Sequence, residues 1–308
     1  MKKVDYVRVD VFAKKPFGGN PLAVFPDGRG LTSGQMQQLA REMNLSETTF
    51  VVPPTRGSGA DFRVRIFTPD MEVPYAGHPT IGTFYVLSML GKIRLKGPVT
   101  TAMMEVKAGV MPVEIYSRSG KVDRVVTVQN KPVFGKEHPD PGLVAEALSL
   151  RRQDLWTDKA PVQLVSTGLP WLMALANSRK AVESVRGNPQ AFTEVVKDLP
   201  KGVVDIYVTC LDPVEKGSTT HSRGLSLVLG SIVEDPATGS ASGNLGAYLV
   251  HHGLLKPKGD RISFINEQGY EIGRPSKISV DVGISGGEIE SVRVGGTVVR
   301  MMEGTAYL

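Results

Sequence analysis

Glu234-Asp235-Pro236-Ala237-Thr238-Gly239-Ser240 is the stretch from which the fold of this chain is best inferred. Asp before Pro is typical of a helix start, because the carboxylate caps backbone N–H groups and Pro at the first helical position loses no hydrogen bond. The sequence therefore predicts a helix from Pro236 to about His252, before Gly253. Gly239 and Ser240 would leave backbone donors at its positive end, where a carboxylate or phosphate binds readily.

A second stretch of this form lies upstream, at Gly77-His78-Pro79-Thr80-Ile81-Gly82-Thr83, and the two prolines are 157 residues apart. Both predicted helices are apolar or small all the way round, as buried helices are, and both end at a glycine. The repetition predicts an internal duplication in which each half wraps a sheet around one central helix. The two helix starts are then expected to converge on a cleft between the halves, with backbone donors at Gly82, Thr83, Gly239 and Ser240.

The length of 308 residues allows two domains, each with its own core. The first is expected to span residues 1–117 and the second 118–296, with the last strand, 297–308, crossing back to the first. A content of 41% hydrophobic and 22% charged residues is ordinary for a soluble globular protein.

Several classes of function are disfavoured by what the sequence contains. The net charge of +5 comes from scattered Lys and Arg without a basic run, which argues against nucleic-acid binding. Neither a signal peptide nor an apolar run of membrane-spanning length is visible. The single cysteine, Cys210, lies in a strand-like segment and fits a buried thiol in a reducing cytoplasm. Motifs for NAD, ATP or zinc do not occur, so neither a cofactor nor a metal is expected.

Two further residues sit at junctions between predicted elements. Thr32-Ser33-Gly34-Gln35 has the form of a capping box and predicts a helix through Met43, after which Glu47 opens a strand. His78 follows a strand and opens a helix. For Glu47 the simplest role is solvated surface, and for His78 it is a helix cap, so position alone leaves a functional role open for both.

Five segments together resemble one known family. They are FGGNPLAVF at 17–25, NLSETTFV at 44–51, RIFTP at 65–69, AGHPTIGT at 76–83 and EDPATGSA at 234–241, and they resemble the PhzF-like phenazine-biosynthesis isomerases in the order of that family. The resemblance implies an α+β, diaminopimelate-epimerase-like fold: two similar domains, each a curved, mostly antiparallel, barrel-like sheet around a central helix. The duplication inferred from the two prolines agrees with that fold.

The resemblance also implies roles for individual residues. Glu47, His78 and Asp235 would be catalytic, and substrate contacts would come from Gly77, Gly82, Thr83, Gly239 and Ser240. One segment departs from the family, since Ser222–Leu227 lacks the Arg-x-Phe element common before the second motif. Some proteins related to this family racemise their substrates with two opposed cysteines. This chain has no such pair, because the matching positions are near Gly77 and Asp235.

The implied reaction is a cofactor-independent hydrogen shift on a small cyclic carboxylate such as trans-2,3-dihydro-3-hydroxyanthranilate. Such a shift needs one positioned acid/base and a carboxylate clamp. An epimerase or lyase acting on another small carboxylate, and a non-catalytic metabolite-binding protein, are the alternatives. Glu47 argues against the last, because a binding module needs no carboxylate at that junction. A cytoplasmic homodimer without nucleic-acid or membrane partners is expected.

Overall fold

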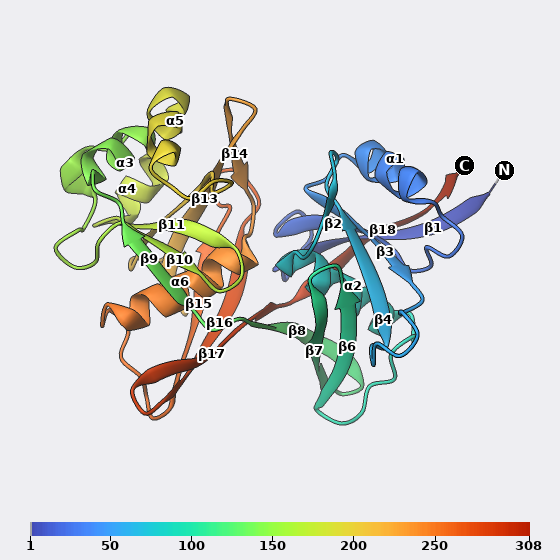
Figure 1. Cartoon of the computed structure of the whole chain (residues 1–308). Coiled ribbons are helices and arrows are strands. Elements are labelled where there is room, and N and C mark those ends of the chain that lie inside the picture. Colours follow the sequence, from blue (N-terminus) through green and yellow to red (C-terminus); the bar gives the residue numbers. More distant parts are fainter. Residues whose placement is uncertain (1) are drawn as a thin grey trace. The chain divides into compact units, whose positions relative to one another are not determined.

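The computed structural model describes residues 2–308 and divides into two compact units (Figure 1). Unit 1 comprises the chain up to Val128 together with Gly295–Leu308, and unit 2 comprises Gln129–Val294. The first unit therefore extends beyond the expected end at residue 117. The reason is a strand, Lys121–Gln129, that pairs antiparallel with Gly109–Arg118 and completes the sheet of unit 1.

Unit 1 contains a central helix, α2 (Gly77–Met89), and a capped outer helix, α1 (Ser33–Met43). Its strands are β1 (Lys3–Val11), β2 (Asn20–Phe25), β3 (Glu47–Val52), β4 (Phe62–Phe67), β5 (Glu72–Val73), β6 (Val99–Val106), β7 (Gly109–Arg118), β8 (Lys121–Gln129) and β18 (Val298–Tyr307). The C-terminal strand β18 lies antiparallel beside the N-terminal strand β1, as the adjoining blue and red arrows of Figure 1 show.

Unit 2 contains a central helix, α6 (Gly239–His251), with the shorter helices α3 (Pro141–Ala147), α4 (Arg179–Ser184) and α5 (Pro189–Lys197) and a 3₁₀ turn, η1 (Arg152–Asp154). Its strands are β9 (Val133–Glu137), β10 (Gln163–Ser166), β11 (Pro170–Leu175), β12 (Asp205–Cys210), β13 (Thr220–Val228), β14 (Ser231–Asp235), β15 (Arg261–Gln268), β16 (Ser276–Ser285) and β17 (Glu288–Gly296).

The two units repeat one order of strand pairing. In unit 1, β1 pairs antiparallel with β2, β2 parallel with β3, β3 antiparallel with β4, β4 antiparallel with β5, and β4 parallel with β6. In unit 2 the same series runs through β10, β11, β12, β13, β14 and β15. In each unit the central helix is inserted before the last strand of the series. The fold is therefore α+β with two similar domains, as the sequence predicted.

The helices themselves correct the predicted register of the repeat. Both have 13 residues, and 162 residues separate both their first and their last members. One hydrogen bond repeats at this spacing: Thr80 Oγ1 donates to Ala76 O and Ser242 Oγ to Thr238 O, each at 2.9 Å. The spacing of 157 between the prolines is thus not the structural one. Pro79 lies inside α2, whereas Pro236 lies three residues before α6.

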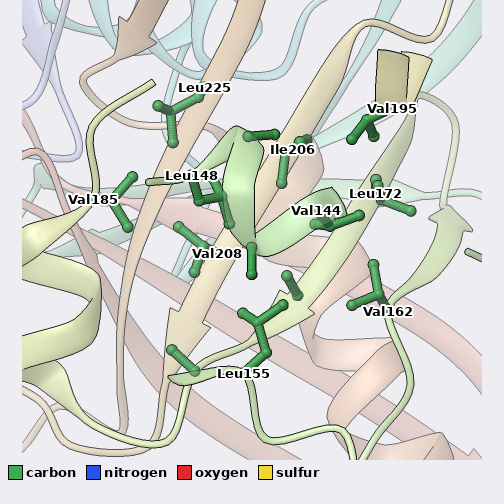
Figure 2. Close-up of a cluster of buried hydrophobic side chains, with 14 of the residues drawn as sticks. Val144, Leu148, Leu155, Val162, Leu172, Val185, Val195, Ile206, Val208 and Leu225 are labelled. Atoms are coloured by element: carbon green, nitrogen blue, oxygen red, sulfur yellow. The ribbon is translucent and has the colours of Figure 1, made fainter. Parts of the chain in front are cut away.

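Burial explains why the two helices lack an amphipathic pattern. Each carries ten buried residues, and α2 packs against β1, β2 and β7 while α6 packs against β10, β11 and β16. A separate apolar cluster in unit 2 joins α3, α4 and α5 to the outer face of the sheet (Figure 2). Its centre is formed by Val144, Leu148, Phe192, Ile206 and Val208, all fully buried.

Smaller predictions about local structure are also confirmed. Thr32 and Gln35 form the capping box of α1, and Asn44 ends that helix in the left-handed conformation (φ 48°). Cys210 is a free, buried thiol in β12, and burial raises its pKa to about 11. Among the described residues 2–308 we find no helix of the length and apolarity that crossing a membrane requires.

Candidate active site

Unit 1 brings Glu47 and His78 together although they are far apart in the sequence. The Oε2 atom of Glu47 lies 3.4 Å from Nε2 of His78. The His78 side chain is only 7% exposed and that of Glu47 is 19% exposed. The carboxylate and the imidazole thus lie side by side, partly shielded from water, without a hydrogen bond between these two atoms.

Local structure explains the proximity. The left-handed residue Asn44 terminates α1, and the chain enters β3 directly at Glu47, which lies opposite Leu22 of the parallel strand β2. Gly82 in turn packs α2 against β1 and β2, since a Cβ atom there would lie 2.6 Å from the Leu22 side chain. The first turn of α2 is therefore held beside the start of β3, and His78 is the second residue of that turn.

Burial sets the protonation state of His78. It lowers the pKa of the imidazole to about 3, because the charged form loses its hydration. The neighbouring carboxylate favours the charged form, but burial dominates, so His78 is neutral at neutral pH. Its Nε2 atom is buried and has no hydrogen-bond partner within residues 2–308. A buried polar atom of this kind is costly unless a ligand satisfies it.

The start of α2 differs from the prediction and changes the roles of two residues. The helix begins at Gly77 and has no side-chain cap, so the backbone N–H groups of its first turn, at Gly77 and His78, have no helical acceptors. Gly82 and Thr83 lie deeper in the helix, where N–H groups bond within it. Thr83 is fully buried, and its hydroxyl pairs with that of Thr49 at 2.8 Å. The expectation that Gly82 and Thr83 offer backbone donors is wrong.

Unit 2 places Asp235 at the end of β14 and starts α6 at Gly239. The helix therefore begins three residues after Pro236, and Thr238 is its N-cap. The Thr238 hydroxyl does not cap the helix but donates to Oδ2 of Asp235 at 2.5 Å. Gly239 and Ser240 are the first two helical residues, so their N–H groups have no acceptors within the helix.

An arginine–glutamate pair precedes each central helix. Arg65 of β4 binds Glu72 through two bonds of 2.8 and 2.7 Å, and Arg223 of β13 binds Glu234 through two bonds of 2.9 and 2.6 Å. The segment Ser222–Leu227, which departs from the Arg-x-Phe element, thus still contains the arginine of that element. Leu225, which replaces the aromatic residue, is buried in the apolar cluster of unit 2.

Sequence analysis missed a buried polar group next to Asp235. Gln268, at the end of β15, is fully buried and binds both Thr238 and the backbone carbonyl of Asp235. Tyr207 of β12 is likewise fully buried and donates to Gln268 at 2.8 Å. The one signal was the run Asn266-Glu267-Gln268, where three polar residues in succession close a strand.

A cavity of about 670 Å³ in unit 1 does not involve these residues. It lies along β1 and β18, and its basic side chains already have partners. Arg29 pairs with Asp27, Lys92 donates to Pro26 O, and Lys2 donates to Arg29 O. The fourth basic side chain of the lining, Lys3, lies over the ring of Tyr307, 5.6 Å from its centroid.

Comparison with protein families gives a match over residues 9–304 to the family described as phenazine biosynthesis-like protein. The trans-2,3-dihydro-3-hydroxyanthranilate isomerase of Pseudomonas aeruginosa is 35% identical over 305 residues, which cover 98% of this chain and 99% of that protein. An uncharacterised isomerase of Bacillus subtilis, YfhB, is 31% identical and covers 97% of both chains.

Solved structures agree with these sequence relatives. The phenazine biosynthesis protein of the PhzF family from Bacillus anthracis matches with a TM-score of 0.89 and 29% identity over the whole of both chains. A hydroxyproline epimerase from Agrobacterium vitis, at 14% identity and a TM-score of 0.65, covers 99% of this chain and 91% of its own and shares the fold alone. The chain therefore belongs to the phenazine biosynthesis-like (PhzF) family and is an isomerase of that type.

Proposed function

We propose that this isomerase catalyses a cofactor-independent hydrogen shift on a small cyclic amino or hydroxy carboxylate, of which trans-2,3-dihydro-3-hydroxyanthranilate is the first candidate. The observation that carries the proposal is the buried Nε2 atom of His78, without a hydrogen-bond partner in residues 2–308 and 3.4 Å from the Glu47 carboxylate. The candidate substrate comes from the name of the Pseudomonas aeruginosa relative.

In the proposed mechanism Glu47 acts as base and then as acid. Its carboxylate removes a proton from one ring carbon, and the resulting carboxylic acid returns a proton to another, so substrate and product have the same composition. Neither oxidant nor reductant is required. His78 is neutral because burial lowers its pKa to about 3, so it does not form a permanent ion pair with Glu47. Its Nε2 atom instead hydrogen-bonds a polar group of the substrate.

Asp235 and the start of α6 are assigned to substrate binding in the same reaction. The first-turn N–H groups at Gly239 and Ser240 suit a carboxylate or a developing negative charge. The Asp235 carboxylate suits the amino or hydroxyl group of the substrate. An Asp235→Asn variant keeps the shape but loses the charge, and we expect weaker binding together with slower turnover.

The test follows deuterium in heavy water. Wild type should exchange and isomerise trans-2,3-dihydro-3-hydroxyanthranilate by NMR, whereas Glu47→Gln should still bind it but turn it over ~10²–10⁴-fold more slowly, the usual contribution of a general acid/base. Glu42→Gln, on the exposed side of α1, is the matched control and should behave as wild type. Isomerisation by Glu47→Gln at the wild-type rate would exclude the assigned base.

We further propose that the enzyme works as a homodimer in the cytoplasm, without nucleic-acid or membrane partners. Support comes from the single, buried cysteine and from exposed apolar side chains on β18, Met302 at 50% and Tyr307 at 59%. Light scattering after size-exclusion chromatography measures the mass, and a mass of one chain at micromolar concentration would contradict the dimer.

A further inference from the structure

Gln268 lies behind Asp235 in unit 2 and uses its whole hydrogen-bonding capacity there. Its Oε1 atom accepts from the backbone N–H of Thr238 at 2.9 Å and from the hydroxyl of Tyr207 at 2.8 Å. Its Nε2 atom donates to the carbonyl of Asp235 at 2.8 Å and to the hydroxyl of Thr238 at 2.9 Å. A carboxamide has two donors and two acceptor lone pairs, so all four are engaged.

These bonds fix the direction of a series of hydrogen bonds that ends on the carboxylate of Asp235. The Thr238 hydroxyl has one proton, and it gives that proton to Oδ2 of Asp235. It must therefore accept from Gln268, and the backbone N–H and carbonyl on either side allow only one orientation of the Gln268 amide. Nε2 of Gln268, the hydroxyl of Thr238 and the carboxylate of Asp235 thus form one chain of hydrogen bonds.

The surroundings keep this chain rigid. Gln268 and Tyr207 are fully buried, and Thr238 is 7% exposed. Tyr207 accepts in turn from Nδ2 of Asn266 at 2.7 Å, so the amide is anchored on both sides. Gly224 has no side chain and so leaves space for the hydrogen bond between Gln268 and Thr238. A Cβ atom there would lie 3.1 Å from Oγ1 of Thr238 and 3.2 Å from Nε2 of Gln268.

We propose that Gln268 is a positioning residue for the isomerisation, acting through Thr238 to hold the Asp235 carboxylate and the start of α6 in their reactive arrangement. The inference rests on the proposed role of Asp235. Gln268 holds the turn from Asp235 to Thr238 at both ends, by the carbonyl of the first and the amide of the second. Without it, one oxygen of the carboxylate loses a hydroxyl donor of fixed direction, and the first turn of the helix loses its anchor.

The principal variant is Gln268→Met, which keeps the volume and removes all four hydrogen bonds. We expect kcat to fall about 10–100-fold, the range found when hydrogen-bond partners that orient metal ligands are removed, with KM changed less. Gln163→Met is the matched control: Gln163 is also a buried glutamine of unit 2, but it binds Gly135 and His252. Thr238→Ser keeps the hydroxyl and should lose less kcat than Thr238→Val, which should resemble Gln268→Met. This pair carries the test if Gln268→Met does not fold.

A double-mutant cycle separates positioning from general destabilisation. In an Asp235→Asn background Gln268→Met should cost less than about twofold, because the carboxylate that it orients is gone. An equal loss of kcat in both backgrounds, or a wild-type kcat for Asp235→Asn or for Gln268→Met, would overturn the inference.

A measurement that needs no substrate tests the role of Gln268 independently of the proposed function. The proposed function itself fails if wild type leaves the candidate substrate unchanged. Hydrogen exchange of the Thr238 amide should be at least about tenfold faster in Gln268→Met and unchanged in Gln163→Met, because only the first removes its acceptor. Unchanged exchange in Gln268→Met would overturn the inference whether or not a substrate is known.

Discussion

Raising the pH through 9 should weaken unit 2 by deprotonating His221. This histidine of β13 is fully buried, with Nε2 at 2.7 Å from Oε1 of Glu271 and Nδ1 at 3.7 Å from Oε2 of Glu267. Tyr270 contacts the ring edge to face, and Arg223 lies 4.0 Å from Glu271. Burial alone would lower the pKa of His221, but the hydrogen bond between Nε2 and Glu271 and the negative charge of both glutamates outweigh it and raise the pKa to about 9.

The size and sign of the effect follow from linkage. An unfolded histidine has a pKa of about 6.5, and each pKa unit corresponds to about 1.36 kcal/mol. The folded pKa lies above the unfolded one, so the stabilisation is complete below pH 6.5 and is lost as the pH rises through 9. The loss amounts to about 3 kcal/mol between pH 6 and pH 9.5. This value is the stability lost when His221 is deprotonated. It does not mean that the charged histidine and its glutamates stabilise the fold more than apolar residues in their place would.

Tryptophan fluorescence during urea unfolding measures this loss selectively, because both tryptophans, Trp156 and Trp171, belong to unit 2. Cys210, paired with His221 across the strands, stays protonated in this range since burial raises its pKa to about 11. His221→Gln should remove the extra alkaline loss, and His252→Gln, a histidine elsewhere in unit 2, should not. A wild type that loses less than about 1 kcal/mol, or a His221→Gln variant that loses as much as wild type, would refute the reasoning.

Two further predictions concern unit 1. Burial lowers the pKa of His78 to about 3, below the unfolded value, so this histidine reduces the free energy of unfolding as the pH falls below 6.5. His78→Asn should therefore unfold less readily than wild type at pH 4, as measured by circular dichroism. An unchanged pH dependence of unfolding in this variant would contradict the prediction. Gly82→Val should destabilise unit 1 by about 1–3 kcal/mol, because its side chain would overlap Leu22, whereas Gly34→Ala at an open position of α1 should not; equal urea midpoints for both would contradict the packing.

Elements specified by local chemistry were predictable from the sequence. The capping box at Thr32 and the left-handed Asn44 define both ends of α1, and the apolar helix segments correctly indicated burial. The closeness of Glu47 and His78 was not predictable from the residues themselves. It depends on the parallel pairing of β2 with β3 and on the fit of Gly82 against Leu22, which are contacts between distant segments.

The buried polar network of unit 2 escaped sequence analysis for a related reason. In β15, Asn266, Glu267 and Gln268 succeed one another, which ordinarily indicates a strand end in solvent. All three are fully buried, because each finds its partners on other strands or loops: Thr220 and Ser222, the amides of Val214 and Glu215, and Thr238. Buried polar groups are stable only when paired, and the pairing is a property of the tertiary structure.

The repeat also explains why the two prolines indicated a wrong alignment of the two halves. At the structural spacing of 162 residues Gly77 corresponds to Gly239, and both open a helix whose first-turn N–H groups suit an anion. His78 therefore corresponds to Ser240 and not to Asp235, which ends a strand before its helix. The duplicated halves thus share packing and helix starts, but the groups proposed to react or to bind substrate stand at different positions in the two. This arrangement does not supply two equivalent acid/base groups, which racemisation by opposed thiols requires, and it agrees with the hydrogen shift that we propose for the carboxylate of Glu47.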